Sequence, residues 1–227
     1  MKRGKIFVIE GTDCSGKATQ TKMLLERLRA DNIPCETLSF PRYDTPTGDI
    51  IKRYLGKDGY QQEFGPAVDV PPKIASVLYA EDRYAAKPLI EQIINSGKHL
   101  ILDRWVEANM GHQGGKIAKE KREEFFKWVD ELEYGTFQLP RPNLVFFLYM
   151  PHQIGIELKK GRPGEADGHE SNLDHLREAE KAYIQLANIF SWKRIDCTSD
   201  GTIRTLRSPE DISNEVYKNV INIINKD

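Results

Sequence analysis

Residues 5–19 read KIFVIEGTDCSGKAT, an apolar run followed by two glycines at a fixed spacing and a lysine. The apolar run from Ile6 to Ile9 is typical of a buried parallel strand, and an amphipathic helix is expected directly after it. Between strand and helix stands Gly11-x-x-x-x-Gly16-Lys17, the spacing of a phosphate-binding loop. Glycines let backbone N–H groups turn inward, while the helix N-terminus and the Lys17 ammonium add positive charge. We therefore expect a bound nucleoside triphosphate; the alternative is an ordinary glycine-rich turn.

The loop departs from the usual pattern at one position. Ala18 stands where Ser or Thr ordinarily ligates Mg²⁺. Thr19 does not replace it, because one helical step turns a side chain by about 100°. Any metal must therefore depend more on phosphate oxygens, water and carboxylates. The residues expected to bind ATP are Gly11, Thr12, Asp13, Cys14, Ser15, Gly16, Lys17, Ala18 and Thr19.

Length and composition point to one α/β domain over residues 1–227. The formal net charge is −1 with 30% charged residues, so there is no global basic field for a nucleic-acid polymer. Cys14, Cys35 and Cys197 have neither disulfide nor metal-ligand spacing, which favours a reducing compartment. Cys14 is either a reactive thiol or, more simply, a small side chain filling the loop. With no apolar run of membrane-spanning length and no targeting segment, we expect a soluble, cytoplasmic protein.

Apolar runs and helical periodicity alternate along the chain. This alternation predicts a five-stranded parallel sheet with helices on both faces. The expected strands are 5–10, 35–40, 99–103, 143–149 and 192–196. The expected helices are 17–31, 46–56, 71–96, 116–133, 151–160, 172–190 and 209–225, the last opened by Ser208 as N-cap.

Two segments lie outside this alternation. Residues 161–171 (GRPGEADGHES) are polar and glycine-rich, which is typical of a mobile lid, and we set the lid at about 159–172. Residues 57–70 have no clear period and are expected to form an ordered excursion.

Charged side chains follow two of the predicted strands. Ligands bind at the carboxyl ends of parallel strands, so Arg42, in Phe40-Pro41-Arg42-Tyr43, is placed to clamp a second phosphate. Asp103 is placed for a metal or its waters, and Arg104 for bridging two phosphates, because phosphoryl transfer needs positioning and charge neutralisation. The alternatives are a surface arginine at Arg42 and a structural Asp103–Arg104 pair.

One long predicted helix carries an aromatic residue and an arginine on the same face. Tyr79 and Arg83 are four residues apart, so they share one side of the helix at 71–96. A ring that stacks and a guanidinium that reaches a carbonyl suit a planar base. Packing on the helix surface is the alternative explanation for the pair.

Together these motifs resemble the thymidylate kinase family over nearly the whole chain. The resemblance rests on Glu10-Gly11-Thr12-Asp13, Gly16-Lys17-Ala18-Thr19-Gln20, the Phe40–Tyr43 motif, the pair at 79 and 83, Asp103-Arg104 and the lid. It implies a P-loop kinase fold, ATP and Mg²⁺ as cofactors, dTMP as acceptor, and a homodimer. The implied reaction transfers the ATP γ-phosphoryl group to dTMP, giving dTDP and ADP in dTTP synthesis.

The resemblance also assigns residues by position. It places Tyr79, Arg83 and Asn109 at the base, with Gln113 in the same Asn-x-x-x-Gln-Gly segment. The whole implied dTMP set is Asp13, Phe40, Arg42, Tyr43, Tyr79, Arg83, Arg104, Asn109, Gln113 and Tyr183. Catalysis is implied for Lys17, Arg104, Asp103, Asp13 and Arg162, and Mg²⁺ for Asp103 and Asp13, directly or through water.

The family differs in where an extra cation comes from: the phosphate loop or the lid. The loop here reads Asp13-Cys14-Ser15, with no basic residue before Lys17. Lys159, Lys160 and Arg162 cluster at the lid entrance, so we expect the lid-supplied type with Arg162 at the γ-phosphate. The alternative is a solvated basic helix end favoured by the dipole.

Two other functions stay open on the sequence alone. Another small P-loop kinase, for a deoxynucleoside or a different monophosphate, would share the loop and lid. An ATP-binding module without transferase activity is suggested by Ala18. His112 stands where the family commonly has an aromatic residue close to the sugar, which leaves sugar selectivity open.

Overall fold

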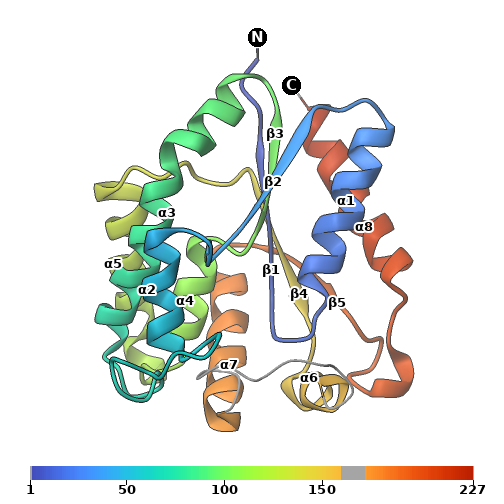
Figure 1. Cartoon of the computed structure of the whole chain (residues 1–227). Helices are drawn as coiled ribbons and strands as arrows, with labels where there is room; N and C mark the ends of the chain where they lie inside the picture. The colour runs from blue at the N-terminus through green and yellow to red at the C-terminus, as the bar shows by residue number, and fades with distance from the viewer. Residues whose placement is uncertain (1, 160–171, 227) are drawn as a thin grey trace.

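A five-stranded parallel sheet runs through the centre of the computed structural model, which describes residues 2–159 and 172–226 (Figure 1). The strand order is β2-β3-β1-β4-β5. Strand β1 is therefore central, with β2 and β3 on one side of it and β4 and β5 on the other. In an open parallel sheet, ligands bind outside the carboxyl ends of the strands at such a switch point. The predicted fold class is therefore confirmed. The strands are β1 (Ile6–Gly11), β2 (Cys35–Ser39), β3 (His99–Asp103), β4 (Leu144–Tyr149) and β5 (Lys193–Asp196).

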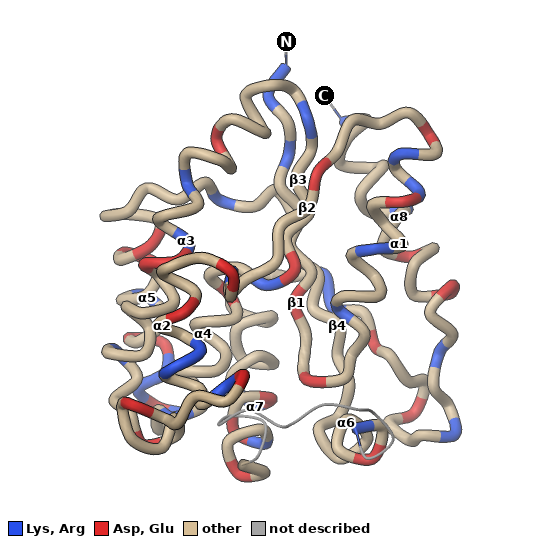
Figure 2. The backbone as a smooth tube through the Cα atoms, in the orientation of Figure 1, with Lys and Arg blue, Asp and Glu red and all other residues tan. Residues whose placement is uncertain are grey.

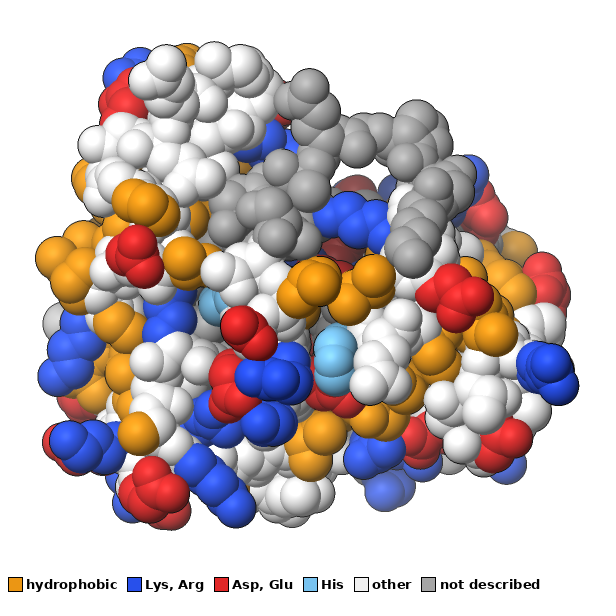
Figure 3. Space-filling model, turned by 90° about the horizontal axis from the view of Figure 1, so that it is seen from below, with side chains coloured by type: hydrophobic (Ala, Val, Ile, Leu, Met, Phe, Trp, Pro, Cys, Tyr) orange, Lys and Arg blue, Asp and Glu red, His pale blue; other side chains and the backbone are white. Residues whose placement is uncertain are grey.

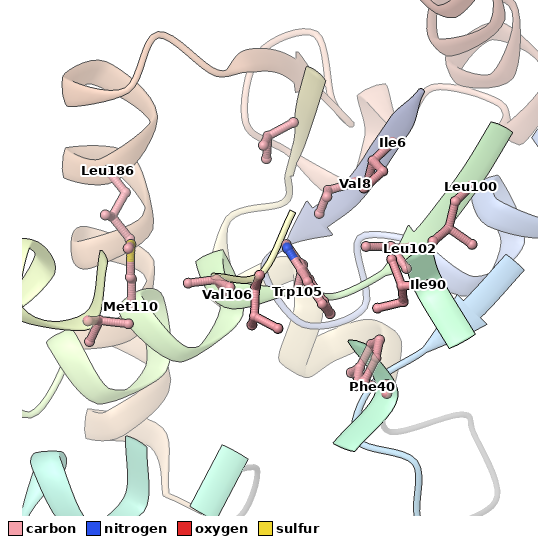
Figure 4. Close-up of a cluster of buried hydrophobic side chains, with 14 of the residues drawn as sticks. Ile6, Val8, Phe40, Ile90, Leu100, Leu102, Trp105, Val106, Met110 and Leu186 are labelled. Atoms are coloured by element: carbon pink, nitrogen blue, oxygen red, sulfur yellow. The ribbon is translucent and has the colours of Figure 1, made fainter. Parts of the chain in front are cut away.

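Helices cover both faces of the sheet, because β1 sends alternate side chains in opposite directions. Ile6 and Val8 pack into one apolar cluster, which Figure 4 shows together with Trp105 and Leu186. Phe7 and Ile9 pack into a second cluster on the opposite face. Helices α1 (Lys17–Ala30), α6 (His152–Lys159) and α8 (Pro209–Ile224) cover the second cluster. Helices α3 (Pro72–Asn95), α4 (Val106–Gly114), α5 (Arg122–Asp130) and α7 (Leu173–Ile189) cover the first.

The excursion at 57–70 packs against α2 (Pro46–Leu55). Ala67 and Val70 are buried with Ile51 and Tyr54 of that helix, in a cluster that also includes the first turn of α3. The Tyr54 hydroxyl donates to the Ala67 carbonyl at 2.9 Å. The segment is therefore ordered by a small apolar core of its own beside α3.

Helix α4 was not predicted, and its glycines explain why. Gly111 and Gly114 lower intrinsic helix propensity by about 1 kcal/mol each. The fold needs small residues there, since a Cβ on Gly111 would lie 2.5 Å from the Tyr183 ring. A Cβ on Gly114 would lie equally close to Phe126, at 2.5 Å. Helix α4 thus forms because α5 and α7 pack closely on it.

The predicted helix at 116–133 is wrong in its detail. A 3₁₀ turn at Lys119–Lys121 precedes α5, and a π-helical turn at Glu131–Thr136 follows it. π-helical turns are rare and occur frequently at functional sites. This turn carries Glu133, which reaches the site described below.

Charges of both signs are interspersed over the molecule (Figure 2). This agrees with the net charge of −1. Ser208 is the N-cap of α8, and its side chain accepts from the Asp211 N–H as predicted. None of the helices in the described residues is long and apolar enough to cross a membrane.

Candidate active site

The phosphate loop lies between β1 and α1, at the carboxyl end of the central strand (Figure 1). Gly11 lies tightly against β4, because a Cβ there would be 2.5 Å from the Leu148 carbonyl oxygen. Gly16 has φ +85°, a left-handed conformation that glycine adopts without steric cost. The loop geometry therefore demands glycine at both positions for two different reasons.

Lys17 and Asp13 give the loop its charges. The Lys17 ammonium is buried and donates to the carbonyl oxygens of Gly11 at 3.0 Å and Thr12 at 2.9 Å. Burial and the charge of Arg104 lower the pKa of Lys17. Burial alone would raise the pKa of Asp13, but Lys17 and Arg104 outweigh it and hold that pKa at about 2. Asp13 is therefore ionised at neutral pH.

Arg104 sits next to the loop in an uncommon backbone conformation. Its φ is +65°, and its N–H donates to the Ile9 carbonyl at 3.2 Å. Nη2 lies 3.4 Å from Asp13 Oδ1, and Nη1 lies 3.0 Å from His112 Nε2. Burial and the neighbouring Arg104 charge lower the pKa of His112 well below its ordinary value, so the imidazole is neutral. Non-glycine residues with positive φ concentrate at functional sites.

A buried carboxyl group in β1 connects the loop to α4 and α7. Glu10 Oε1 accepts from the Trp105 N–H at 2.7 Å, and Oε2 accepts from the Tyr183 hydroxyl at 3.3 Å. Burial raises the pKa of Glu10 to about 7, against the opposing effect of Arg104. Glu10 therefore fixes the backbone directly after Arg104 at the cost of burying an ionisable group.

Two cavities meet at Asp13. The loop cavity, about 310 Å³, lies between the phosphate loop, α6 and α7, and Thr12, Cys14 and Lys159 are in its lining. The α3–α4 cavity, about 170 Å³, lies on the other side of Asp13. Seen from this end of the molecule, basic, acidic and histidine side chains gather together (Figure 3). Of the ten residues expected at the acceptor, eight line the α3–α4 cavity: Asp13, Phe40, Tyr43, Tyr79, Arg83, Arg104, Asn109 and Gln113.

The polar wall of the α3–α4 cavity is held by Glu133. Arg83 donates to its two oxygens, from Nε at 2.5 Å and from Nη2 at 2.7 Å. Asn109 Nδ2 donates to Glu133 Oε1 at 2.9 Å and to the Ser76 carbonyl at 3.1 Å. One carboxylate therefore orients both side chains that the family resemblance led us to expect at the base.

Two of the expected acceptor residues lie elsewhere. Arg42 is held by Asp82 of α3: its N–H donates to Oδ2 at 2.8 Å and its Nε to Oδ1 at 3.1 Å. Tyr183 lies in the wall of the loop cavity, where its hydroxyl meets Glu10. Asp103 ends β3 and lines neither cavity. Arg162 and most of the expected lid lie outside the described residues.

Comparison with known proteins identifies the family. The thymidylate kinase family model matches residues 9–205. The human thymidylate kinase is 30% identical over 202 residues, covering 87% of this chain and 84% of that protein. The enzyme of Dictyostelium discoideum is 27% identical over 217 residues, covering 95% and 84%.

The chain belongs to the thymidylate kinase family. A solved thymidylate kinase structure from Candida albicans has the same fold, with a TM-score of 0.72 at 19% identity. That match covers 97% of this chain and 92% of the other. Members of this family are ATP-dependent nucleoside monophosphate kinases, which agrees with a phosphate loop facing a second cavity.

The family resemblance implies Mg²⁺, and the residues near the phosphate loop could provide only some of the ligands of such an ion. Among the described residues, no three His, Cys, Asp or Glu side chains form a group that would hold a metal ion. Mg²⁺ at phosphoryl-transfer sites needs only one or two carboxylates, with water and substrate phosphates as the other ligands. Asp13 and Asp103 supply such carboxylates, and Ala18 supplies no oxygen. The residues therefore suit a cation that arrives with the substrate phosphates.

Three functional contacts of this family member were not foreseen from its sequence. The contacts of Glu10 could have been predicted, because an acidic residue within an apolar strand indicates a buried hydrogen-bond partner. Asp82 stands beside Arg83 on α3 but gives no sign that it pairs with Arg42. Glu133 gives no signal at all, since it belongs to an unpredicted π-helical turn 50 residues from Arg83.

Proposed function

We propose that this protein transfers the γ-phosphoryl group of ATP to the 5′-phosphate of dTMP, giving ADP and dTDP. The observation that carries the proposal is the position of Asp13 and Arg104. Asp13 lines both cavities, and Arg104 pairs with it while lining the α3–α4 cavity. A donor phosphate on the loop and an acceptor phosphate in the α3–α4 cavity would therefore meet at this pair.

The α3–α4 cavity offers the groups that a nucleoside monophosphate needs. Tyr79 presents a ring for the base, and Arg83, Asn109 and Gln113 present polar groups beside it. Phe40 and Tyr43 line the cavity next to Arg42, whose guanidinium would meet the phosphate. These assignments support dTMP as acceptor through residue chemistry and family membership together.

The donor would lie along the phosphate loop. Backbone N–H groups of residues 11–19 suit the triphosphate. A polar cavity of about 650 Å³ is lined by residues of β5, of α8 and of the segment between them. Cys197, which lies between two lining residues in sequence, donates from its thiol to the Ser15 carbonyl of the phosphate loop at 3.6 Å. We assign the nucleoside of ATP to this side of the loop.

Charge neutralisation and positioning would perform the catalysis. Asp103 and Asp13 would hold Mg²⁺ together with the nucleotide, and the ion would supply neutralisation of phosphate charge. Lys17 and Arg104 place positive charge near Asp13, and Arg162 of the lid is proposed to add a further cation. His112, being neutral, accepts from Arg104 without competing for the phosphates.

A coupled assay with ATP and a panel of acceptors tests the function. We expect turnover with dTMP, less with dUMP, and none with thymidine or dGMP. Turnover of thymidine in place of dTMP would identify a deoxynucleoside kinase. ATP binding without dTDP formation at saturating Mg²⁺ would identify a nucleotide-binding module.

We also propose a cytoplasmic homodimer. Cys35 and Cys197 are buried and take part in no disulfide, which suits a reducing compartment. Helix α3 exposes Ile74, Val77 and Tyr84 to solvent, at 51%, 44% and 50%. Such a line of apolar side chains on one helix suits burial against a second copy. Light scattering on wild type and Tyr84→Glu tests this, with a shift towards monomer expected in the variant.

A further inference from the structure

Glu133 is buried between two cavity residues and uses both of its oxygens. It has 0% exposure and lies on the π-helical turn Glu131–Thr136, beside but not in the lining of the α3–α4 cavity. A carboxylate only accepts hydrogen bonds. Every group that faces it must therefore be a donor, which fixes how Arg83 and Asn109 are oriented.

The consequence for Asn109 is a fixed amide orientation. Its Nδ2 donates to Glu133 and to the Ser76 carbonyl, so both amide hydrogens are directed away from the cavity. Its Oδ1 is buried and has no hydrogen-bond partner among the described residues. Asn109 is thereby presented to a ligand as an acceptor.

The consequence for Arg83 is a fixed donor edge. Glu133 takes Nε and Nη2, which leaves Nη1 as the guanidinium nitrogen that this carboxylate does not use. Arg83 and Asn109 both line the α3–α4 cavity. The wall therefore offers one donor and one acceptor in an order that the buried carboxylate sets.

We propose that Glu133 is a positioning residue that sets the base selectivity of the acceptor site. The inference rests on the proposed function and extends it. A base with an N–H next to a C=O, as in thymine and uracil, matches the acceptor of Asn109 and the donor of Arg83. Cytosine has an acceptor nitrogen and an amino group at the same positions. Its acceptor nitrogen would face the acceptor of Asn109, and its amino group would face the donor of Arg83.

The physical reason for strong discrimination is the burial of these groups. A site built to hydrogen-bond a particular edge rejects an analogue that leaves its buried polar groups unpaired. If the Asn109 amide turned over, its Oδ1 would face the Glu133 carboxylate, two acceptors in contact. The Glu133 carboxylate and the Ser76 carbonyl both oppose this inversion, and of the two only the carboxylate also holds Arg83.

The test replaces Glu133 by an amide of the same shape. In Glu133→Gln, one of the two accepting oxygens becomes an NH2 group, so Arg83 or Asn109 faces a donor in place of an acceptor and is no longer held in its orientation. We expect the KM for dTMP to rise about 10- to 100-fold, the scale for a misplaced binding group. We also expect the dTMP-over-dCMP ratio of kcat/KM to fall at least about tenfold, with the KM for ATP unchanged.

The matched control is Glu131→Gln on the same turn. Glu131 is exposed and lines neither cavity, so this variant should keep both the KM and the base preference of wild type. Circular dichroism and the Tm show whether each variant is folded. If Glu133→Gln is unfolded, Glu133→Asp retains the charge and withdraws it by one methylene, and a smaller rise in the KM for dTMP alone is expected.

The outcomes separate the inference from the function it rests on. Wild-type protein that does not phosphorylate dTMP overturns the proposed function. Wild-type protein that does so, with folded Glu133 variants that keep its KM and base preference, overturns only the positioning role. An equal loss with every substrate, including a raised KM for ATP, shows a merely structural role and also overturns it.

Discussion

The phosphate loop and the α3–α4 cavity meet at Asp13 but are built in opposite ways. The loop is one continuous segment, and its Lys17 is held by loop carbonyl oxygens. The cavity collects side chains from the end of β2, from α3 and from α4, and its polar wall is held by Glu133 from a fourth segment. Chemistry of the backbone forms the first region, and packing of distant segments forms the second.

Substitutions in the two regions should therefore change different kinetic constants. Loss of a charge in the loop removes stabilisation of the phosphates, so turnover should fall. Loss of a side chain in the cavity misplaces or weakens the acceptor, so the KM for dTMP should rise. Arg104 lines the α3–α4 cavity and pairs with Asp13 of the loop, and Glu10 connects the two regions through the backbone of Trp105.

The largest effect is expected at Lys17. Lys17→Ala should lower kcat by about 10³-fold or more, because a cation at the transferred phosphoryl group is removed. Steady-state kinetics with dTMP measure this. The control Lys22→Ala changes an exposed position of the same helix and should keep the kcat of wild type. A Lys17→Ala enzyme with a tenth or more of wild-type turnover would contradict the assigned charge.

Arg104 should come second. Arg104→Ala should cut kcat about 10²- to 10³-fold, the scale for losing one such stabilising donor. Arg104→Lys keeps the charge and the same left-handed backbone requirement, so it should retain more activity. Near-normal turnover of the alanine variant would show that Arg104 is only a structural partner of Asp13.

The connection through Glu10 should affect stability more than binding. Folding raises the pKa of Glu10 from 4.5 to about 7, so between these pH values the folded state holds a proton that the unfolded state has released. Stability from this group is therefore fully present below pH 4.5 and is lost as the pH rises to about 7. Glu10→Gln cannot ionise, and its amide can keep both contacts. The free energy of unfolding of this variant should exceed that of wild type at pH 8 by on the order of 3 kcal/mol.

Urea unfolding of wild type and Glu10→Gln at pH 8 and at pH 4.5 measures this difference. The advantage of the variant should vanish at the lower pH. Glu26→Gln, on an exposed position of α1, serves as the control. An equal difference at both pH values would show that ionisation of Glu10 is not the cause.

The smallest effect is expected in the cavity wall. Asn109→Ala should raise the KM for dTMP about tenfold, which corresponds to one hydrogen bond, and should leave the KM for ATP unchanged. Asn219→Ala on α8, across the sheet, is the matched control. A fall in kcat with an unchanged KM for dTMP would mean that the two regions do not fail differently.

Local patterns predicted most of the architecture. All five strands and six of the seven predicted helices were recovered, because each has a strong period or a clear terminal signal such as Ser208. Helix α4 was missed because its glycines argue against a helix until α7 is seen against Gly111. The predicted helix at 116–133 was wrong because no single-sequence signal marks a π-helical turn.

The candidate site divides in the same way. Residues 11–19 were predictable as a phosphate loop because the turn of their backbone requires glycine at two positions. Arg83 and Asn109 were predictable because they stand in motifs of the family. The partners Glu133 and Asp82 were not predictable, since a carboxylate on a helix surface looks the same in sequence whether it is solvated or buried.

The parallel sheet and the phosphate loop were predictable from the sequence alone. These follow from interactions between residues a few positions apart. Only the tertiary structure decided that Asp13 is shared by two cavities, that Arg42 is held by Asp82, and that Glu133 orients Arg83 and Asn109. The physical reason is that a buried hydrogen bond joins groups 24 to 50 residues apart, and its energy depends on burial that only packing creates.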